Sequence, residues 1–424
     1  MPAQLNLSEG VIILPSLVLL KISGLRSDTK SITRERRFNM MKRLAILSLV
    51  AVFATFGVMG TAGASGEVKI GFHAPLTGFA ASDGKSASEG AKLAVEQINS
   101  AGGVGGKLLA LVIYDDQAKA AQAIPIANKL IGQDKVPVGV SGSYSGPTRS
   151  AASVFQDAGI PYISAYGIHP DITRAGDYVF RTSFLGEIQG RAGAKLVGEI
   201  LGKKRVVMVT LQNDFGKSLA TGFKQAAKKF GVEIINEYQY SIKDRQFGSI
   251  VAKVKADNPE VIYASGYYFT AGPLVSQLRG AGITAPVIGQ EGYDSQKFIE
   301  IAGKAAEGVI ITTSLDRDSD VPETRNFIEA FEKKAGFKTD MVAASAHTAI
   351  MVVADAMRRA GTTTDSKAIR DAIAKTDLKV STGTIKFNKL GEVMKAVQVQ
   401  VVRDGNWHRH SVIDDPQLLA PPSK

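Results

Sequence analysis

The sequence contains no cysteine among its 424 residues. This absence excludes disulfide bonds, thiolate metal sites, a cysteine nucleophile and a lipid anchor carried by an N-terminal cysteine. Aromatic residues are also sparse, at 7% of the chain, and no long block of like charges follows residue 64. We therefore expect no nucleic-acid partner and interpret the net charge of +11 as a source of solubility, with a surface for an anionic partner as the alternative.

The motifs of several enzyme classes are missing as well. The chain has no Walker loop, no G-x-S-x-G nucleophile elbow and no H-E-x-x-H metal site. The glycine-rich segment AGGVGGK (101–107) follows a predicted helix and precedes a predicted strand, the reverse of the order in a dinucleotide-binding loop, so it indicates a helix end and a tight turn. His408 and His410 are only a weak metal signal. We expect no catalytic residue, no cofactor and no metal.

The N-terminal 64 residues combine an extension with a segment, from Met41 to Ala64, that is typical of a secretory signal. The letters MKR at 41–43 precede the apolar run LAILSLVAVFATFGVMG, and the small residues AGA at 62–64 fit a cleavage site. This pattern predicts a translation start at Met40 or Met41, cleavage after about Ala64 and export to the periplasm. A retained membrane anchor is the alternative. We leave residues 1–64 out of the predicted fold.

From Glu67 onwards, apolar β-branched runs alternate with amphipathic helical patterns. The first series of predicted strands is 68–74, 108–116, 136–142 and 161–165, with helices at 86–103 and 118–132. The second series is 205–212, 233–240, 261–266, 286–292 and 308–314, with helices at 216–231 and near 247–256. Predicted helices at 322–336, 341–360 and 366–375 and strands at 382–388 and 396–408 follow. Buried strands separated by helices predict an α/β fold of two doubly wound parallel-sheet lobes.

The two series also predict the domain organisation. We expect a first lobe of residues 65–184 and 316–384 and a second lobe of residues 185–315 and 385–412, with a tail at 413–424. The chain would cross between the lobes near 182–187, 314–320 and 380–388. Such a hinge of several crossings would let the lobes close on a small molecule.

One acidic residue stands out at the end of a predicted strand, where ligands bind in sheets of this kind. Glu291 lies in GQEGYD, and the glycines on either side would leave its backbone open to close approach. A carboxylate directed into a cleft can bind an ammonium group through charge-assisted hydrogen bonds. The alternative is a local helix cap.

A hydroxyl-rich loop, SGSYSGPT (141–148), follows another predicted strand. Ser143 and Ser145 suit a ligand carboxylate near the N-terminus of a helix that we expect to open at Thr148. The alternative is a capped helix with solvated serines. Phe215 and Tyr267 would supply aromatic walls, although ordinary core or surface aromatics would look the same.

Asp115 and Asp116 end a predicted strand, a common place for a catalytic acid. We expect them instead to cap the following helix or to line the edge of a cleft. A hydrolase that uses Ser145 or Asp116 is the enzymatic alternative, but the sequence places no base beside either residue.

Together, these segments resemble the branched-chain amino acid (Leu/Ile/Val) binding proteins of ABC transporters, which have the type I periplasmic-binding fold. The resemblance extends from Glu67 to about residue 410. Its landmarks are VKIGFHAPLTG, GAKLAVEQINSAGGVGGK, YDDQ, SGSYSG, AGIPYISA, HPDIT, FRTS, NDFGKS, GYY and GQEGYD. The resemblance implies a monomeric, non-enzymatic receptor that binds an amino acid between its lobes and passes it to the permease subunits of an importer.

The resemblance also implies roles for individual residues. Ser145 and the backbone around Tyr166 and Gly167 would bind the ligand carboxylate, and Glu291 would bind its ammonium group. Two further residues, Phe215 and Tyr267, would close over the ligand from the second lobe.

The sequence departs from the family pattern at two positions. Ile168 stands where many members have a threonine, which removes a donor to the carboxylate. Asp83 stands where an aromatic residue often lines the first loop, which adds a charge. Asp83 would either assist Glu291 with an ammonium group or face solvent, and we expect the second. Both departures motivate an alternative solute, such as an amide, a urea-like compound or an aromatic acid.

Overall fold

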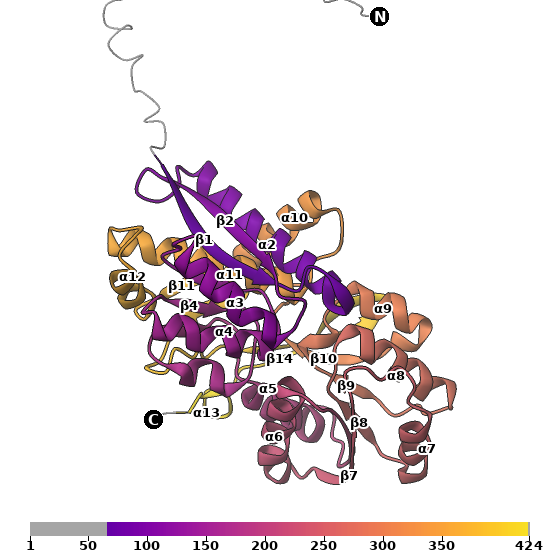
Figure 1. The fold of residues 1–424 in the computed structure, drawn as a ribbon. Helices are drawn as coiled ribbons and strands as arrows, with labels where there is room; N and C mark the ends of the chain where they lie inside the picture. Colours follow the sequence, from indigo (N-terminus) through magenta and orange to yellow (C-terminus); the bar gives the residue numbers. More distant parts are fainter. Residues whose placement is uncertain (1–65, 423–424) are drawn as a thin grey trace, which may run out of the picture. The chain divides into compact units, whose positions relative to one another are not determined.

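Two β-sheets of unequal size organise residues 66–422, the part of the chain that the computed structural model describes (Figure 1). The predicted signal segment at 41–64 lies outside the described residues. A separate two-stranded sheet pairs β11 (Asp377–Val380) with β12 (Gly383–Lys386).

The first sheet has five parallel strands in the order β2-β1-β3-β4-β5. Its strands are β1 (Glu67–Ala74), β2 (Leu108–Asp115), β3 (Gly139–Ser141), β4 (Tyr162–Ser164) and β5 (Val179–Arg181). The helices that connect them are α2 (Ala81–Ser100), α3 (Ala120–Gly132) and α4 (Ser145–Asp157). The short strands β3, β4 and β5 are fully buried, as expected of a parallel sheet with both faces covered.

The second sheet has seven strands in the order β14-β13-β10-β9-β8-β6-β7. Its parallel strands are β6 (Arg205–Leu211), β7 (Glu233–Tyr240), β8 (Val261–Ala264), β9 (Val287–Gly289) and β10 (Ile310–Thr313), and its antiparallel edge is β13 (Val397–Arg403) and β14 (Asn406–Ile413). The main helices of this part are α5 (Gly186–Lys195), α6 (Asp214–Ala227), α7 (Gly248–Asp257), α8 (Tyr268–Gly280) and α9 (Gln296–Ala302).

Three late helices return to the first sheet: α10 (Pro322–Ala335), α11 (Met341–Ala360) and α12 (Ser366–Ile373). In Figure 1 they lie among the early elements, and α11 packs along α2. The fit is close, because a Cβ atom at Gly90 of α2 would overlap the backbone of Ala343. The chain therefore passes between the two sheets in the segments 182–185, 314–321 and 387–396.

Three of the predicted boundaries that differ from the structure have a clear local cause. The predicted strand 396–408 is a hairpin, because Asp404 and Gly405 have φ values of 50° and 71°, as a two-residue type I′ turn requires. The helix expected to open at Thr148 begins at Ser145, since a proline is tolerated in a first helical turn. The helix expected at 86–103 begins at Ala81, directly after a 3₁₀ turn.

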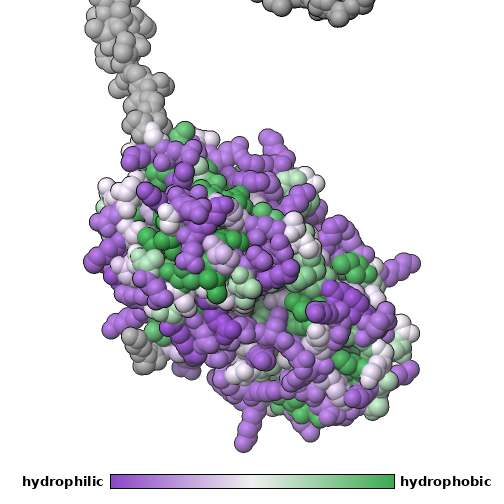
Figure 2. All heavy atoms as spheres, viewed as in Figure 1, coloured by the Kyte–Doolittle hydropathy of each residue, from purple (hydrophilic) through white to green (hydrophobic). Residues whose placement is uncertain are grey.

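Most of the surface visible in Figure 2 is hydrophilic, with hydrophobic side chains in small groups. None of the helices within residues 66–422 combines the length and hydropathy needed to span a bilayer. The hydrophobic residues instead form cores on both sheets.

Candidate ligand-binding site

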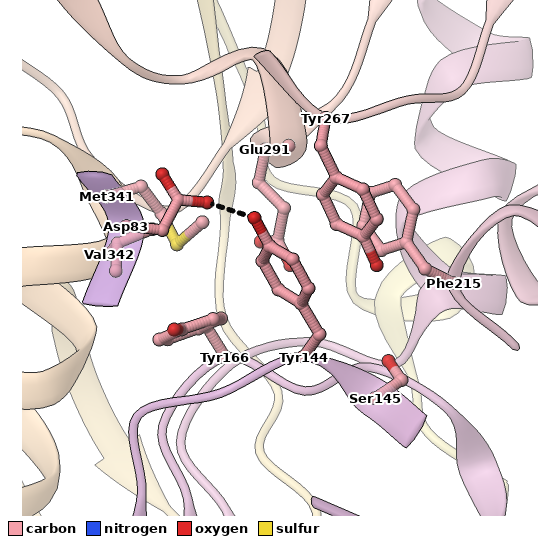
Figure 3. A pocket seen from close by; sticks show the side chains of 10 residues that line it. Asp83, Tyr144, Ser145, Tyr166, Phe215, Tyr267, Glu291, Met341 and Val342 are labelled. Carbon is pink, nitrogen blue, oxygen red and sulfur yellow. Dashed lines mark hydrogen bonds between the residues drawn. The ribbon is translucent and has the colours of Figure 1, made fainter. Parts of the chain in front are cut away.

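One cavity is lined by residues from both sheets and from the start of α11 (Figure 3). Its free space is ≈ 10 Å³, about enough for one water molecule. The lining residues are Asp83, Tyr144, Ser145, Tyr166, Phe215, Tyr267, Glu291, Gly292, Met341 and Val342. This lining joins two acids to four aromatic rings, and no lysine or arginine belongs to it within the described chain.

The start of α4 brings Tyr144 and Ser145 to the cavity. Tyr144 is the N-cap of the helix and Ser145 its first residue. The Ser145 Oγ accepts a hydrogen bond of 3.0 Å from the Ile168 N–H, which leaves the hydroxyl hydrogen free to be donated. Ser143 is also buried, and its Oγ has no hydrogen-bond partner within residues 66–422.

Asp83 lies in the first turn of α2 and is 3% exposed, so the expectation that it faces solvent is wrong. The early start of α2 draws this residue into the cavity. Its Oδ2 accepts a hydrogen bond of 2.7 Å from the Tyr144 hydroxyl, the dashed line in Figure 3. Burial raises the pKa of Asp83 to about 8, against the opposing effect of this hydrogen bond.

The loop after β4 is held by the protein itself. The Tyr166 hydroxyl donates to the Gly142 carbonyl over 2.5 Å, and the Gly167 N–H donates to the Ser164 Oγ over 3.0 Å. Arg181 lies beneath the loop and donates to the Gly167 carbonyl over 2.8 Å. Because the N–H groups of Gly167 and Ile168 are both bonded internally, neither is free for a ligand in this arrangement.

Glu291 begins a short 3₁₀ turn after β9 and is 2% exposed. Neither of its carboxylate oxygens has a hydrogen-bond partner within the described residues, so the side chain does not act as a local helix cap. Burial raises the pKa of Glu291 to about 8, and nearby Lys395 acts in the opposite direction. A buried carboxylate without donors is unfavourable unless a ligand supplies them.

The glycines beside Glu291 have a different role from the predicted one. A Cβ atom at Gly289 would overlap the Tyr293 ring, and one at Gly292 would overlap the Gly266 carbonyl. These glycines therefore let the loop pack closely against the protein, rather than leaving its backbone open.

Lys395 approaches from the third crossing segment and is 8% exposed. Its Nζ has no hydrogen-bond partner in the described chain and lies 5.1 Å from the centre of the Phe184 ring. Burial lowers the pKa of Lys395 to about 7, while Glu291 raises it. The two groups thus influence each other electrostatically without a direct hydrogen bond.

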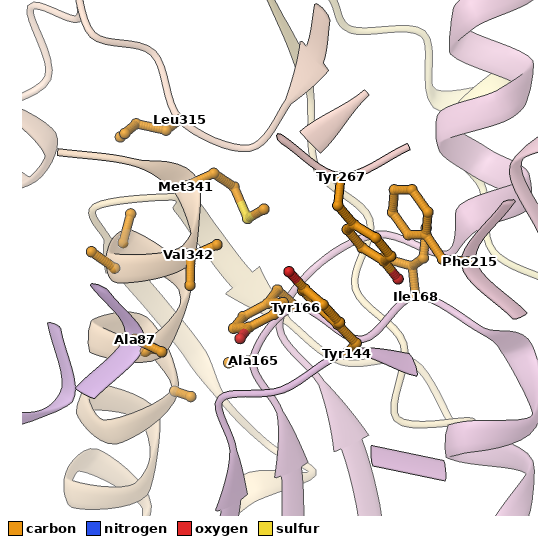
Figure 4. Packing of buried hydrophobic residues seen from close by; sticks show 14 of the residues in the cluster. Ala87, Tyr144, Ala165, Tyr166, Ile168, Phe215, Tyr267, Leu315, Met341 and Val342 are labelled. Atoms are coloured by element: carbon orange, nitrogen blue, oxygen red, sulfur yellow. The ribbon is translucent and has the colours of Figure 1, made fainter. Parts of the chain in front are cut away.

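Aromatic rings from the two sides meet beside the cavity (Figure 4). The Tyr144 and Tyr267 rings stack with centroids 4.0 Å apart, and Phe215 stacks on the other side of Tyr267 at 4.8 Å. Tyr267 caps α8 and Phe215 lies in the first turn of α6. A ligand larger than a water molecule therefore requires these rings to separate.

Six of the nine predicted site residues line this cavity: Asp83, Ser145, Tyr166, Phe215, Tyr267 and Glu291. Ser143, Gly167 and Ile168 are buried nearby but do not line it. The sequence reasoning missed Tyr144, Gly292, Met341 and Val342. Tyr144 lies between the two predicted serines, whereas Met341 and Val342 come from a helix far along the chain that carries no local signal of a site.

The predicted acids at the end of β2 have structural roles. Asp116 is fully buried and its Oδ2 lies 2.6 Å from the His73 Nδ1. Asp115 accepts hydrogen bonds from the N–H groups of Leu76 and Gln117 over 2.8 and 2.9 Å. A substrate could not reach Asp116 in this position.

A family model described as periplasmic binding protein matches residues 67–406. The chain belongs to the periplasmic binding protein family. This periplasmic binding protein is 30% identical over 327 residues to a leucine-, isoleucine-, valine-, threonine-, and alanine-binding protein of Pseudomonas aeruginosa, with 77% of this chain and 87% of the relative covered. It is 31% identical over 329 residues to Leu/Ile/Val-binding protein homolog 3 of Brucella melitensis, with 77% and 89% covered.

Among solved structures, this periplasmic binding protein is similar to the branched-chain amino acid transporter substrate binding protein LivJ from Streptococcus pneumoniae, in complex with isoleucine. The TM-score is 0.77 at 29% identity, with 82% of this chain and 99% of that chain covered. These similarities confirm the predicted fold class and family resemblance. The family is one of binding proteins and not of enzymes, which argues against the hydrolase alternative.

Proposed function

We propose that this protein is the solute-binding subunit of an ABC importer and binds an amino acid in the cavity between its two sheets. The observation that carries the proposal is Glu291, a buried acid on the cavity wall whose carboxylate oxygens have no hydrogen-bond partner within residues 66–422. An α-ammonium group supplies charged donors to such an acid. The names of the relatives from Pseudomonas aeruginosa and Brucella melitensis, and the isoleucine in the LivJ structure, support an amino acid as the solute.

The carboxylate of the amino acid would bind at the opposite side of the cavity. The Ser145 hydroxyl is available to donate, and the first turn of α4 presents backbone N–H groups toward an anion. Tyr166 would flank this end of the ligand, and Phe215 and Tyr267 would close over it.

Binding would require the lobes to open and close about the crossing segments. We assign residues 65–184 and 316–386 to one lobe and 185–315 and 397–412 to the other. The predicted boundary at 384 moves to the crossing segment 387–396, because β12 ends at Lys386 and Glu392 pairs with Arg181 of β5. Opening would separate the stacked rings of Tyr144 and Tyr267, and the closed form would be favoured by ligand contacts to both lobes. We further place the protein in the periplasm as an exported monomer that delivers its ligand to the permease subunits.

The test is calorimetric titration of the protein, purified from a periplasmic fraction, with a panel of amino acids. Glu291→Gln keeps the size of the side chain but removes its charge, so we expect a loss of about 1.5–3 kcal/mol of binding free energy. Glu300→Gln on α9, an exposed acid paired with Lys297, is the matched control and should bind as the unaltered protein does.

Three results would count against this function. The first is binding of no amino acid, and the second is an unchanged affinity in Glu291→Gln. The third is recovery of the protein only with membranes, which would contradict export without an anchor.

A further inference from the structure

The cavity is surrounded by more buried acids than buried cations. Asp83 and Glu291 line it, and Asp294 and Asp340 lie close enough to raise the pKa of Asp83. All four carboxylates are at most 5% exposed. Buried charges in a protein are normally paired, because their desolvation is costly.

Only part of this negative charge is balanced within the protein. Asp294 is paired with Arg317. Asp340 accepts hydrogen bonds from the Ser86 hydroxyl over 2.6 Å and from the Ala343 N–H over 2.8 Å, but from no cation in the described chain. The cation beside Glu291 is Lys395, whose own pKa burial lowers to about 7.

Arg181, the remaining buried cation near Glu291, is already engaged. It donates to both carboxylate oxygens of Glu392 over 3.0 Å. Within the described chain, Asp83, Asp340 and Glu291 have Lys395 as their one nearby cation without an ion-pair partner. Burial raises the pKa of Asp83 and of Glu291 to about 8, so both carboxyl groups hold protons at neutral pH until a cationic ligand displaces them.

Asp83 lines the cavity and has an incomplete set of hydrogen-bond partners. Its one hydrogen bond comes from a neutral phenol, the Tyr144 hydroxyl. Glu291, the other acid on the wall, has no hydrogen-bond partner within residues 66–422 and is almost completely buried. The cavity therefore presents two carboxyl groups, one from α2 and one from the loop after β9, and each can accept more donors.

The rest of the lining suits an aliphatic chain that ends in a cation. Met341 and Val342 supply apolar surface beside Asp83 in Figure 3, which fits the methylene stem of a basic side chain. Once the stacked rings of Tyr144 and Tyr267 separate, their facing surfaces and the Tyr166 ring offer aromatic faces, which attract ammonium and guanidinium groups.

We propose that Asp83 binds a second cationic group of the solute, so that the cavity selects basic amino acids or diamines over neutral amino acids such as leucine. The inference rests on the proposed function, in which Glu291 binds the first ammonium group. A neutral aliphatic ligand would leave Asp83 buried beside an apolar side chain with no charged partner. With a neutral ligand Asp83 keeps its proton, whereas a cationic group displaces that proton and pairs with the carboxylate, so only a basic solute gains the charged hydrogen bond.

The first measurement uses the unaltered protein. Calorimetric titrations with lysine, arginine, an α,ω-diamine such as 1,4-diaminobutane, and leucine compare the four ligand classes. We expect at least one basic ligand to bind about 10- to 100-fold more tightly than leucine, as a charged hydrogen bond predicts. Tightest binding by lysine or arginine supports a basic amino acid, and binding of the diamine alone supports the cation site while rejecting the amino acid as solute.

The second measurement uses Asp83→Asn, which keeps the side-chain volume and an oxygen that can accept from Tyr144. Binding of the preferred basic ligand should weaken by about tenfold or more, while leucine binding should change much less. Glu96→Gln, an exposed acid of the same helix paired with Lys334, is the control for the loss of one negative charge and should behave as the unaltered protein.

Two results would overturn the inference. One is leucine binding to the unaltered protein as tightly as every basic ligand, which leaves the amino-acid function intact but rejects the cation site. The other is an unchanged preference for basic ligands in Asp83→Asn. The comparison of ligands in the unaltered protein decides the question even if the variant does not fold.

Discussion

The two sides of the cavity differ in how fully the protein bonds its own polar groups. On the side of the first sheet, Tyr144 donates to Asp83, and Ser145 accepts from Ile168. On the side of the second sheet, Glu291 has no hydrogen-bond partner in the described chain. Internal hydrogen bonds therefore hold the polar groups of the first side in place, whereas Glu291 on the second side can accept hydrogen bonds from a ligand.

This difference separates two tasks of a binding site. An acid that is buried without donors gains most when a ligand arrives, so we expect Glu291 to contribute most of the polar binding energy. A wall held by internal hydrogen bonds keeps its shape and charge, so we expect Asp83 and its neighbours to select among ligands.

The most severe way to disturb the first side is to break the buried ion pair beneath it. Arg181→Met leaves Glu392 buried without its cation and removes the donors to the carbonyls of Gly167 and His169. We expect the free energy of unfolding to fall by about 3–5 kcal/mol, measured by urea denaturation. In the control Arg174→Met, which breaks an exposed pair with Asp171, the change should stay within about 1 kcal/mol. Equal effects would show that the buried pair does not hold this side.

A second test titrates both sides together. Burial raises the pKa of Asp83 and of Glu291 to about 8, so both carboxyl groups bind protons that a cation must displace. Affinity for a cationic solute should therefore increase from about pH 6 to about pH 8, by up to about tenfold per pH unit for each proton displaced. Calorimetry in buffers of different ionisation enthalpy should also detect proton release on binding.

The free energy of unfolding should change with pH in the direction opposite to affinity. Because the folded-state pKa of each acid is raised, its contribution to the free energy of unfolding is present below the usual carboxyl range and is lost as pH rises through about 8. In the double variant Asp83→Asn with Glu291→Gln, affinity and the free energy of unfolding should both depend less on pH. Affinity that falls as pH rises would contradict the assigned ionisation.

The smallest expected effect comes from a single hydroxyl on the first side. Tyr144→Phe keeps the ring stacked on Tyr267 but removes the hydrogen bond that favours ionised Asp83. We expect about 1 kcal/mol weaker binding of a basic ligand, measured by calorimetry. Tyr238→Phe removes a similar bond, of 2.6 Å to Asp257, away from the cavity and should not change affinity. Equal affinity in both variants would remove Tyr144 from the selective side.

Strands that consist of long apolar runs could be predicted closely from the sequence. The predicted runs 68–74 and 205–212 correspond to β1 and β6 within one residue at each end. Continuous β-branched segments have few alternatives to a buried strand. The strand ends also indicated Glu291 and Ser145, because a parallel sheet presents its ligand-binding loops at one edge.

Features that depend on distant segments could not be predicted. In the sequence, Tyr144 belongs to a hydroxyl-rich loop, but its ring stacks on Tyr267, which caps a helix of the other sheet. Met341 reaches the cavity only because α11 returns to pack on α2. No local sequence pattern predicts such contacts, because the residues that form them lie more than 100 positions apart in the chain.

The sequence by itself determined where buried strands, helices and polar strand ends would lie, because these follow from the periodicity and chemistry of neighbouring residues. Only the tertiary structure decided which of those polar groups are paired. It buried Asp83 against Tyr144, left Glu291 without a partner in the described chain and brought Lys395 near it. The sequence specifies which side chains can ionise, but the free energy of burying each ionised group depends on the surroundings that folding creates.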